Sequence, residues 1–280
     1  MIPAAFEYEA AESVDHAISL LGNYGEDAKV LAGGHSLLPL MKLRFAYPTA
    51  LVDVGRIKEL SYVRDAGDHI AIGATTVHED VHFDNVLIQK CPIVAHTAGE
   101  VGDPQVRHRG TIGGSIAHGD PASDLPTVML ALEATFVVHG PRGERTVAAN
   151  DFFKGTFETD LGVQDVLTEI RVPVLNGAGW SYQKFHHRAQ DWATVGVAAV
   201  VRRSNGGDRS AAVALTSMAD TPMRATAVEG ALASGEDPAA AAQHADEGTN
   251  PVTDPLGSAE YRKEMAKVFT RRALEEALSR

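Results

Sequence analysis

The chain has 280 residues, 44% of them hydrophobic, and a formal net charge of −12 at pH 7. This charge disfavours duplex DNA or RNA as the main partner, because neutralising a phosphate backbone needs a basic face. The single cysteine, Cys91, excludes an internal disulfide framework and an iron–sulfur cluster held by this chain alone, and no apolar run approaches the roughly 18 residues of a membrane span.

The first part of the chain, residues 1–55, is expected to form a small αβαβ unit. Its pattern predicts a helix near residues 11–22, then the strand KVLAGG, a second helix and the strand ALVDV. Gly33 and Gly34 stand between the first of these strands and the second helix. Two glycines at such a corner indicate either tight packing or the close approach of a ligand to the backbone.

The second part, residues 56–177, opens with HIAIGA, whose alternation predicts a strand. Short helices are expected around residues 85–100, followed by a glycine-rich turn and a helix around residues 110–133. Three further strands are predicted in this part: TFVVHG, RTVAA and VLTEIRVPV. The segment LNGAG at 175–179 is typical of a linker.

The third part, residues 178–280, begins with three runs that predict strands: WSYQKFHHR, TVGVAAVVRR and SAAVALTSM. The second and third are joined by SNGGD, a strong hairpin signal. Helices are expected after Pro222, over residues 238–246 and over residues 257–278. In the last of them, the predicted apolar face consists of Tyr261, Met265, Val268 and Phe269. Strands followed by helices indicate an α+β domain, with a three-stranded antiparallel sheet covered on one side.

Several familiar active-site motifs are absent from the sequence. It contains neither the G-x-G-x-x-G of a Rossmann fold, nor the G-x-x-x-x-G-K-[ST] of a P-loop, nor a G-x-S-x-G elbow. The segment HEDVH at 78–82 fits the zinc-protease pattern H-E-x-x-H. It follows a strand and precedes the turn-like FDN, which leaves little room for the long helix that a zinc site needs. We therefore interpret it as the start of a surface helix.

Two glycine segments share the same arrangement. The first is AGGHSL at 32–37, and the second is TIGGS at 111–115, after which an apolar helix is expected to begin near Pro121. Consecutive backbone N–H groups near a helix start can hold an anion, and Ser36, Thr111 and Ser115 add hydroxyl donors. Two such turns suit the two sides of a diphosphate. The alternative is that double glycines make packing corners.

Asp120 and Asp124 follow the second segment, and carboxylates repel phosphate. They are suited instead to sugar hydroxyls or to a ring N–H, for which an ionised carboxylate is a strong acceptor. A ligand with a diphosphate, a polyol and an imide-bearing ring meets all of these requirements, and FAD is such a ligand. The sequence therefore predicts non-covalent FAD.

At this point the sequence resembles a known family. AGGHSLLPLMKLRFAYPTALVDVGRI and GDPQVRHRGTIGGSIAHGDPASDLP are similar to segments of the medium, FAD-binding subunit of the molybdenum hydroxylases. The resemblance covers essentially the whole chain and looks closest to the carbon monoxide dehydrogenases. It implies a vanillyl-alcohol-oxidase-like (PCMH-type) FAD-binding fold of two subdomains, 1–55 and 56–177, and a C-terminal sheet-plus-helices domain, 178–280.

The resemblance also implies roles for individual residues in cofactor binding. The predicted set contains the two glycine segments, the acidic residues after them, and positions near the flavin ring: Ala32, Gly33, Gly34, His35, Ser36, Leu37, Val101, Thr111, Gly114, Ser115, His118, Asp120, Asp124, Leu167, Lys184 and Trp192. Trp192 stands where relatives often have tyrosine, and His118 where some have asparagine. Without the resemblance, Val101 and Leu167 would be interpreted as core residues, Lys184 as a solvated strand residue and Trp192 as a packing anchor.

The function that follows from the resemblance is electron transfer. A large molybdenum-binding subunit would oxidise the substrate, and a small [2Fe-2S] subunit would pass electrons to FAD and on to a quinone or another acceptor. The implied assembly is a dimer of heterotrimers in the cytoplasm, attached at most peripherally to the membrane. Alternatives are a medium subunit of an N-heterocycle, xanthine or aldehyde hydroxylase, a stand-alone flavin oxidase or reductase, and a binding module without flavin.

Overall fold

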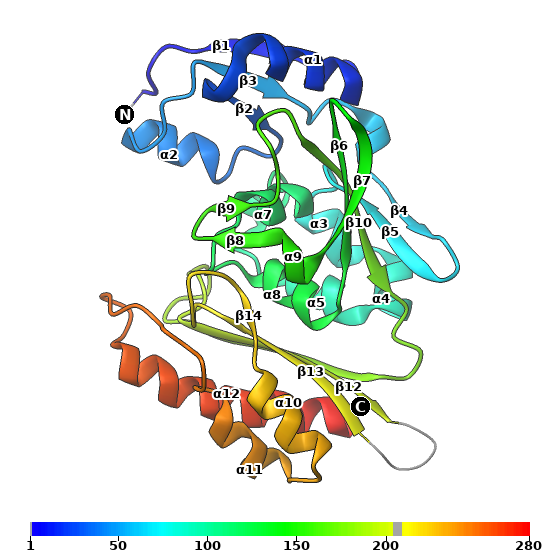
Figure 1. Ribbon diagram of the computed structural model, residues 1–280, viewed down its shortest axis with the longest axis vertical. Coiled ribbons are helices and arrows are strands. Elements are labelled where there is room, and N and C mark those ends of the chain that lie inside the picture. The colour runs from blue at the N-terminus through cyan, green and yellow to red at the C-terminus, as the bar shows by residue number, and fades with distance from the viewer. Residues whose placement is uncertain (1, 204–208) are drawn as a thin grey trace.

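The structure, a computed structural model, describes residues 2–203 and 209–280, so the predicted SNGGD turn at 204–208 lies outside the described residues. Three sheets follow one another along the long axis of the molecule, from the N-terminal unit at the top of Figure 1 to the C-terminal unit at the bottom. The α+β class is confirmed. The domain boundaries at 55/56 and 177/178 stay predictions.

The N-terminal unit is a three-stranded parallel sheet with strand order β1-β3-β2. Its elements are β1 (Glu7–Ala10), α1 (Val14–Tyr24), a 3-10 turn (Gly25–Asp27), β2 (Ala28–Leu31), α2 (Leu37–Leu43) and β3 (Ala50–Asp53). Ser13 caps α1 by accepting a hydrogen bond from the N–H of His16. Strand β1 was not predicted, because half of its residues are glutamates and only its pairing with β3 makes it a strand.

The central unit is a five-stranded antiparallel sheet with strand order β4-β5-β10-β6-β7. The strands are β4 (Val63–Asp65), β5 (His69–Gly73), β6 (Thr135–Gly140), β7 (Gly143–Ala148) and β10 (Val166–Pro173), and a small hairpin adds β8 (Phe153–Gly155) and β9 (Glu158–Thr159). The helices are a 3-10 turn (Lys58–Leu60), α3 (His78–Phe83), α4 (Asn85–Lys90), α5 (Pro92–Gly99), α6 (Pro104–Arg107), α7 (Ile112–His118), α8 (Asp124–Ala131) and α9 (Ala149–Phe152).

The C-terminal unit is a four-stranded antiparallel sheet of β11 (Gly179–Phe185), β12 (Val195–Arg203), β13 (Arg209–Thr216) and β14 (Met223–Arg224). The prediction of three strands missed β14, whose two residues are too few to show an alternating pattern. The helices are α10 (Thr226–Ala233), α11 (Pro238–Ala241) with a 3-10 turn (Ala242–His244), and α12 (Ala259–Ser279), which lie together on the outer side of the sheet in Figure 1.

Strand β12 explains why the C-terminal sheet joins the rest of the molecule. Val195, Val197 and Ala199 pack into the core shared with α10 and α12, whereas Ala198 and Val200 belong to the core of the central unit. Successive residues of a strand point to opposite faces, so a strand buried on both faces is apolar at every position. The sheet is therefore held between its own helices and the central unit.

The predicted apolar face of the last helix was wrong. Tyr261 and Val268 are exposed, and Met265 and Phe269 are only partly buried. The buried side of the helix is dominated by small residues, with one arginine and one leucine among them: Arg262, Ala266, Thr270, Ala273, Leu274 and Ala277. Small side chains let the helix approach the sheet closely, so the buried face was not the one with the largest apolar residues.

Over the described part of the chain, no helix has the length and apolar character that crossing a membrane requires.

Candidate functional site

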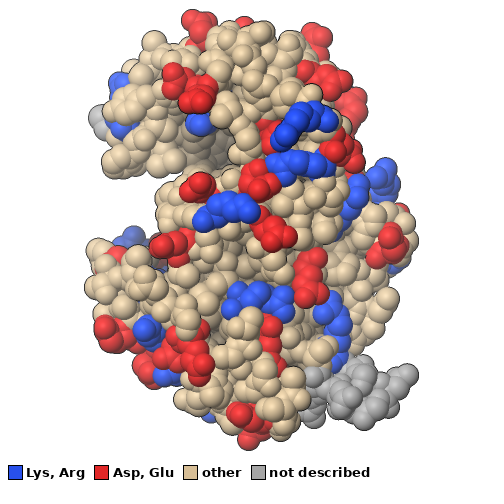
Figure 2. Space-filling view, viewed as in Figure 1, with Lys and Arg blue, Asp and Glu red and all other residues tan. Residues whose placement is uncertain are grey.

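A cleft of about 610 Å³ lies between the N-terminal and central units, and its opening is visible as the deep notch at the upper left of Figure 2. A volume of this size is in the range of cofactor-binding sites. The cleft brings together every predicted site residue except Asp120. The Asp120 carboxylate instead accepts a hydrogen bond from the N–H of Ala122, within its own turn.

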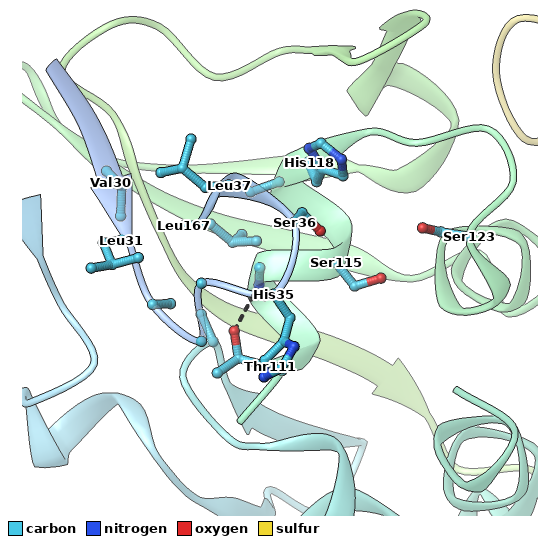
Figure 3. Close-up of a pocket in the computed structure, with 18 of the residues that line it drawn as sticks. Val30, Leu31, His35, Ser36, Leu37, Thr111, Ser115, His118, Ser123 and Leu167 are labelled. Carbon is cyan, nitrogen blue, oxygen red and sulfur yellow. Dashed lines mark hydrogen bonds between the residues drawn. The ribbon is translucent and has the colours of Figure 1, made fainter. Parts of the chain in front are cut away.

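The first glycine segment enters the cleft as an open loop before α2. Gly34 has φ +77°, a left-handed conformation that glycine adopts without strain. Among the described residues, the N–H groups of residues 33–37 have no hydrogen-bond acceptor, although the neighbouring Leu38 N–H donates to the Gly34 carbonyl. Five consecutive free donors form a cradle for an anion. Figure 3 shows this loop with the His35 ring turned towards Thr111.

The second glycine segment is a helix, not the predicted turn. Thr111 caps α7, and its hydroxyl accepts a hydrogen bond from the Gly114 N–H at 3.1 Å, drawn as the dashed line in Figure 3. The N–H groups of Ile112, Gly113 and Ser115 donate to Thr76, Ala74 and Thr111. The expected anion cradle of backbone donors is therefore absent from these residues, and the apolar helix α8 begins at Asp124 rather than near Pro121.

Gly113 fits the alternative interpretation of the double glycines, in which they make a packing corner. A Cβ on this residue would lie 2.5 Å from the Cβ of Ala74, so glycine is needed where α7 meets the end of β5. Gly114 differs, because a Cβ there would meet only the hydroxyl that caps its own helix. The hydroxyl of Ser115 and that of Ser123 face the same space in Figure 3. Around Gly114, the cleft therefore presents the hydroxyl donors of Ser115 and Ser123 and a backbone without a side chain.

The first glycine segment also packs on the two residues that precede the second segment. A Cβ on Gly33 would overlap the carbonyl oxygen of Arg109 and lie 2.8 Å from the Cα of Gly110. Next to this contact, His78 is buried beneath Gly110. Burial, followed by the charges of Arg107 and His35, lowers the pKa of His78 to about 4, so its ring is neutral at pH 7.

The cleft lining also contains a buried ion pair. Lys184, from β11, donates from Nζ to Asp124 Oδ2 at 2.9 Å and to the Glu100 carbonyl at 2.9 Å. The Tyr182 hydroxyl donates to Asp124 Oδ1 at 2.5 Å. Burial raises the pKa of Asp124, and Lys184 and Tyr182 oppose that effect. The side chains of Lys184 and Asp124 are only 3% and 6% exposed, so a ligand here meets a desolvated pair.

The remaining predicted residues, Val101, His118, Leu167 and Trp192, also line the cleft. A bulge between Leu167 and Glu169 interrupts the pairing of β10 with β6, beside the point where Leu167 lines the cleft. The centroid of the His118 ring lies 4.9 Å from the centroid of the Phe157 ring. Burial lowers the pKa of His118. Trp192 is 64% exposed and lies at the rim, which contradicts the alternative of a packing anchor.

Only the first residue of the H-E-x-x-H segment, His78, lines the cleft. The surface interpretation of the segment was wrong for His78, which is 3% exposed. Glu79 pairs with Arg107 at 3.0 Å, and His82 Nδ1 lies 2.8 Å from the Ala95 carbonyl, so the three side chains turn to different neighbours. Over the described residues, no group of three or more His, Cys, Asp or Glu residues could hold a metal ion.

Sequence reasoning missed part of the lining. The additional residues come from β2, α3, α6, the β8–β9 hairpin, the segment between β9 and β10, and the loop between β11 and β12. They include Lys29, Val30, Leu31, His78, Val106, Phe157, Leu161, Val163, Gln190 and Asp191. Only Phe157 carries a structural peculiarity, a φ of +59° that is rare for an aromatic residue. Nothing in the sequence around these positions distinguishes them from ordinary strand or turn residues.

Comparison with known proteins identifies the family of this chain and its cofactor. Residues 4–175 match the family described as the FAD binding domain in molybdopterin dehydrogenase, and residues 180–277 match the CO dehydrogenase flavoprotein C-terminal domain. The chain belongs to the FAD-binding medium subunits of the molybdenum hydroxylases. Its cofactor is FAD, and it is an oxidoreductase subunit. In this family, molybdopterin and the iron–sulfur clusters are on other subunits.

Individual relatives cover the chain from end to end. It is 46% identical to the carbon monoxide dehydrogenase medium chain of Hydrogenophaga pseudoflava, over 100% of this chain and 99% of that one. It is 38% identical to the glyceraldehyde dehydrogenase medium chain of Sulfolobus acidocaldarius, over 99% of each. The solved structure of the carbon monoxide dehydrogenase from Hydrogenophaga pseudoflava that lacks the Mo-pyranopterin moiety superposes with TM-score 0.96 and 48% identity, over 100% and 99% of the two chains.

The cap of α7 gives a testable prediction. Replacing Thr111 by alanine removes the acceptor of the Gly114 N–H, so we expect the free energy of unfolding to fall by about 1 kcal/mol. It also frees that N–H within the cleft and removes a hydroxyl. The matched control is Ser13→Ala, which removes the cap of α1 at the edge of the N-terminal unit. Both variants should lose similar stability in urea, but only Thr111→Ala should change the FAD dissociation constant. Equal affinities in the two variants would exclude a binding role for Thr111.

Proposed function

We propose that this chain is the FAD-binding electron-transfer subunit of an aerobic carbon monoxide dehydrogenase. The observation that carries the proposal is the free backbone cradle at residues 33–37, in a cleft whose lining also contains the Asp124–Lys184 pair. The substrate assignment is supported by the 46% identity to a protein named as a carbon monoxide dehydrogenase medium chain. The glyceraldehyde dehydrogenase relative, at 38%, favours an aldehyde as the second candidate substrate.

We assign different residues of the cleft to the diphosphate, the polyol chain and the ring of FAD. The N–H groups of residues 33–37 would bind the diphosphate, and Gly34 keeps side-chain atoms away from it. The hydroxyls of Ser115 and Ser123 would bind the polyol chain. Val101 and Leu167 supply apolar surface for the ring, and Lys184 supplies a cation beside it. The sixteen residues predicted above are proposed contacts on this basis, except Asp120, which lies outside the cleft lining.

FAD takes up electrons singly and can release them as a pair, which suits a carrier between one-electron clusters and a two-electron acceptor. The chain's own contribution is to bind, orient and partly desolvate the cofactor. Lys184 places a positive charge in a dry environment, where charges interact more strongly than in water. Trp192 at the exposed rim is placed to limit the access of water and of the acceptor.

We further propose the partners and place of action. A large molybdenum subunit would oxidise carbon monoxide, and a small [2Fe-2S] subunit would deliver the electrons. Two such heterotrimers would form the complex in the cytoplasm, and a quinone or another acceptor would remove the electrons, with at most peripheral contact between the complex and a membrane. The lone cysteine, buried Cys91, agrees with clusters held on another chain.

Purification from the native source tests this proposal. The expected preparation is yellow, contains a large and a small partner chain, and oxidises carbon monoxide with a quinone analogue as acceptor. A yellow preparation that contains both partners but turns over only an aldehyde or an N-heterocycle would replace the substrate assignment. A yellow chain that purifies alone and turns over a substrate would favour a stand-alone flavin oxidase. A colourless chain that binds no added FAD would contradict the binding role itself.

A further inference from the structure

The buried ion pair at the cleft continues into the C-terminal sheet as a chain of polar groups. Asp124 lies at the start of α8, in the central unit, whereas Tyr182 and Lys184 stand two residues apart on β11. Residues two apart on a strand share a face, so both side chains reach Asp124 from the same side. One carboxylate thus receives two donors from the C-terminal unit, at 2.5 Å from Tyr182 and 2.9 Å from Lys184.

The Tyr182 hydroxyl lies in a closely packed, buried part of the C-terminal sheet. A Cβ on Gly196 would lie 2.8 Å from this hydroxyl and 2.8 Å from the hydroxyl of Thr216, so glycine leaves the space in which they meet. Thr216 donates in turn to the hydroxyl of Thr127 on α8, at 2.7 Å. Tyr182 is 4% exposed and Thr216 and Thr127 are fully buried, so none of these groups has water as an alternative partner.

Lys184 and Asp124 are the members of this chain of polar groups that line the cleft. An ammonium group has three N–H donors, and Lys184 uses one for Asp124 and one for the Glu100 carbonyl. The third is left for a ligand in the cleft, which Lys184 lines. The direction of this third N–H depends on where the Asp124 carboxylate is held, and the Tyr182 hydroxyl fixes one of the two oxygens of that carboxylate.

We propose that Tyr182 is a positioning residue of the FAD site: its hydroxyl orients Asp124, which fixes the Lys184 ammonium beside the flavin. This inference rests on the proposed FAD contact of Lys184. Tyr182 does not line the cleft and touches no ligand in this scheme, so it acts only through Asp124 and Lys184. The C-terminal sheet thereby becomes a part of the flavin site rather than a separate structural domain.

The test compares two Tyr→Phe variants. Tyr182→Phe removes the donor to Asp124 but keeps the ring. The matched control is Tyr62→Phe, because Tyr62 also donates to a carboxylate, Glu169, at 2.5 Å, but neither residue lines the cleft. Losing a hydrogen bond to a charged group typically costs about tenfold or more in an equilibrium constant. We expect the FAD dissociation constant to rise about tenfold in Tyr182→Phe and to stay within about twofold of wild type in Tyr62→Phe.

A second readout separates positioning from stability. At saturating FAD, the visible circular dichroism of the bound flavin should change in Tyr182→Phe and not in Tyr62→Phe. Gly196→Ala, which crowds the Tyr182 hydroxyl from outside the cleft, should change it in the same sense. Wild-type spectra and affinity in both Tyr182→Phe and Gly196→Ala would overturn the inference. Wild-type protein that binds no FAD would instead contradict the proposed function, so the two failures are distinguishable.

Discussion

The variant Gly34→Val is expected to weaken FAD binding strongly. Gly34 has φ +77°, which a β-branched residue adopts only with strain of about 1–3 kcal/mol, and a Cβ there would lie 2.9 Å from Leu38 Cδ1. Valine should therefore push the loop out of the conformation that presents the N–H groups of residues 33–37. We expect the FAD dissociation constant, measured by flavin fluorescence on the apoprotein, to rise at least about tenfold to a hundredfold.

The control for this variant is Gly25→Val. Gly25 has a similar φ, +74°, with no other atoms within 4 Å of its Cβ position, and it lies outside the cleft. It should therefore show the backbone strain as a loss of stability, with FAD affinity unchanged. If Gly34→Val keeps the affinity of the wild type, the backbone cradle does not bind the diphosphate. Ser115→Ala should weaken binding less than Gly34→Val, because it removes one hydroxyl and leaves the backbone in place.

The variant Lys184→Met is expected to have the largest effect on stability. It leaves the Asp124 carboxylate buried without its cation, and breaking a buried ion pair in this way typically costs about 3–5 kcal/mol. We expect the free energy of unfolding in urea at pH 7 to fall by about that amount. The control, Lys90→Met, breaks an exposed pair with Asp65 and should change stability by about 1 kcal/mol or less.

The deficit of Lys184→Met should depend on pH with a definite sign. Burial raises the pKa of Asp124, and Lys184 lowers it, so the variant carboxyl has a folded pKa still higher than in the wild type. A raised folded pKa adds stability below the unfolded pKa, and this stability is lost as the pH rises through the folded pKa. The deficit should therefore shrink in acid and grow towards neutral pH. A deficit independent of pH would mean that Asp124 is not the group left unpaired.

The two glycine segments show how far sequence reasoning reached into the site. It located both segments at the cleft and assigned both the same role, because their residues are nearly the same. The structure separates them. Residues 33–37 form an open loop with free donors, whereas residues 112–115 have their N–H groups occupied by Thr76, Ala74 and Thr111. Which donors are free depends on partners far away in the sequence, and a local motif does not contain them.

The buried polar network contains a residue that sequence reasoning did not find. Asp124 was predicted as a ligand contact from its chemistry and Lys184 through the resemblance, but Tyr182 was not singled out at all. It becomes part of the site only because β11 lies against the start of α8, 58 residues away in the chain. His78 likewise belongs to the site only through a contact with a distant segment. It lines the cleft because it packs against Gly110, just before the second glycine segment.

The sequence by itself determined the α+β class, the order of most helices and strands, and the two glycine segments that line the cleft. Strand alternation, glycine corners and helix patterns are local properties, because they follow from backbone sterics and side-chain periodicity. Only the tertiary structure decided which face of α12 is buried, that β1 and β14 are strands, and which backbone donors and side chains remain free for FAD. These features depend on pairing and burial between segments that are distant in the sequence. The free energy of such contacts depends on both segments together, so neither segment shows it alone.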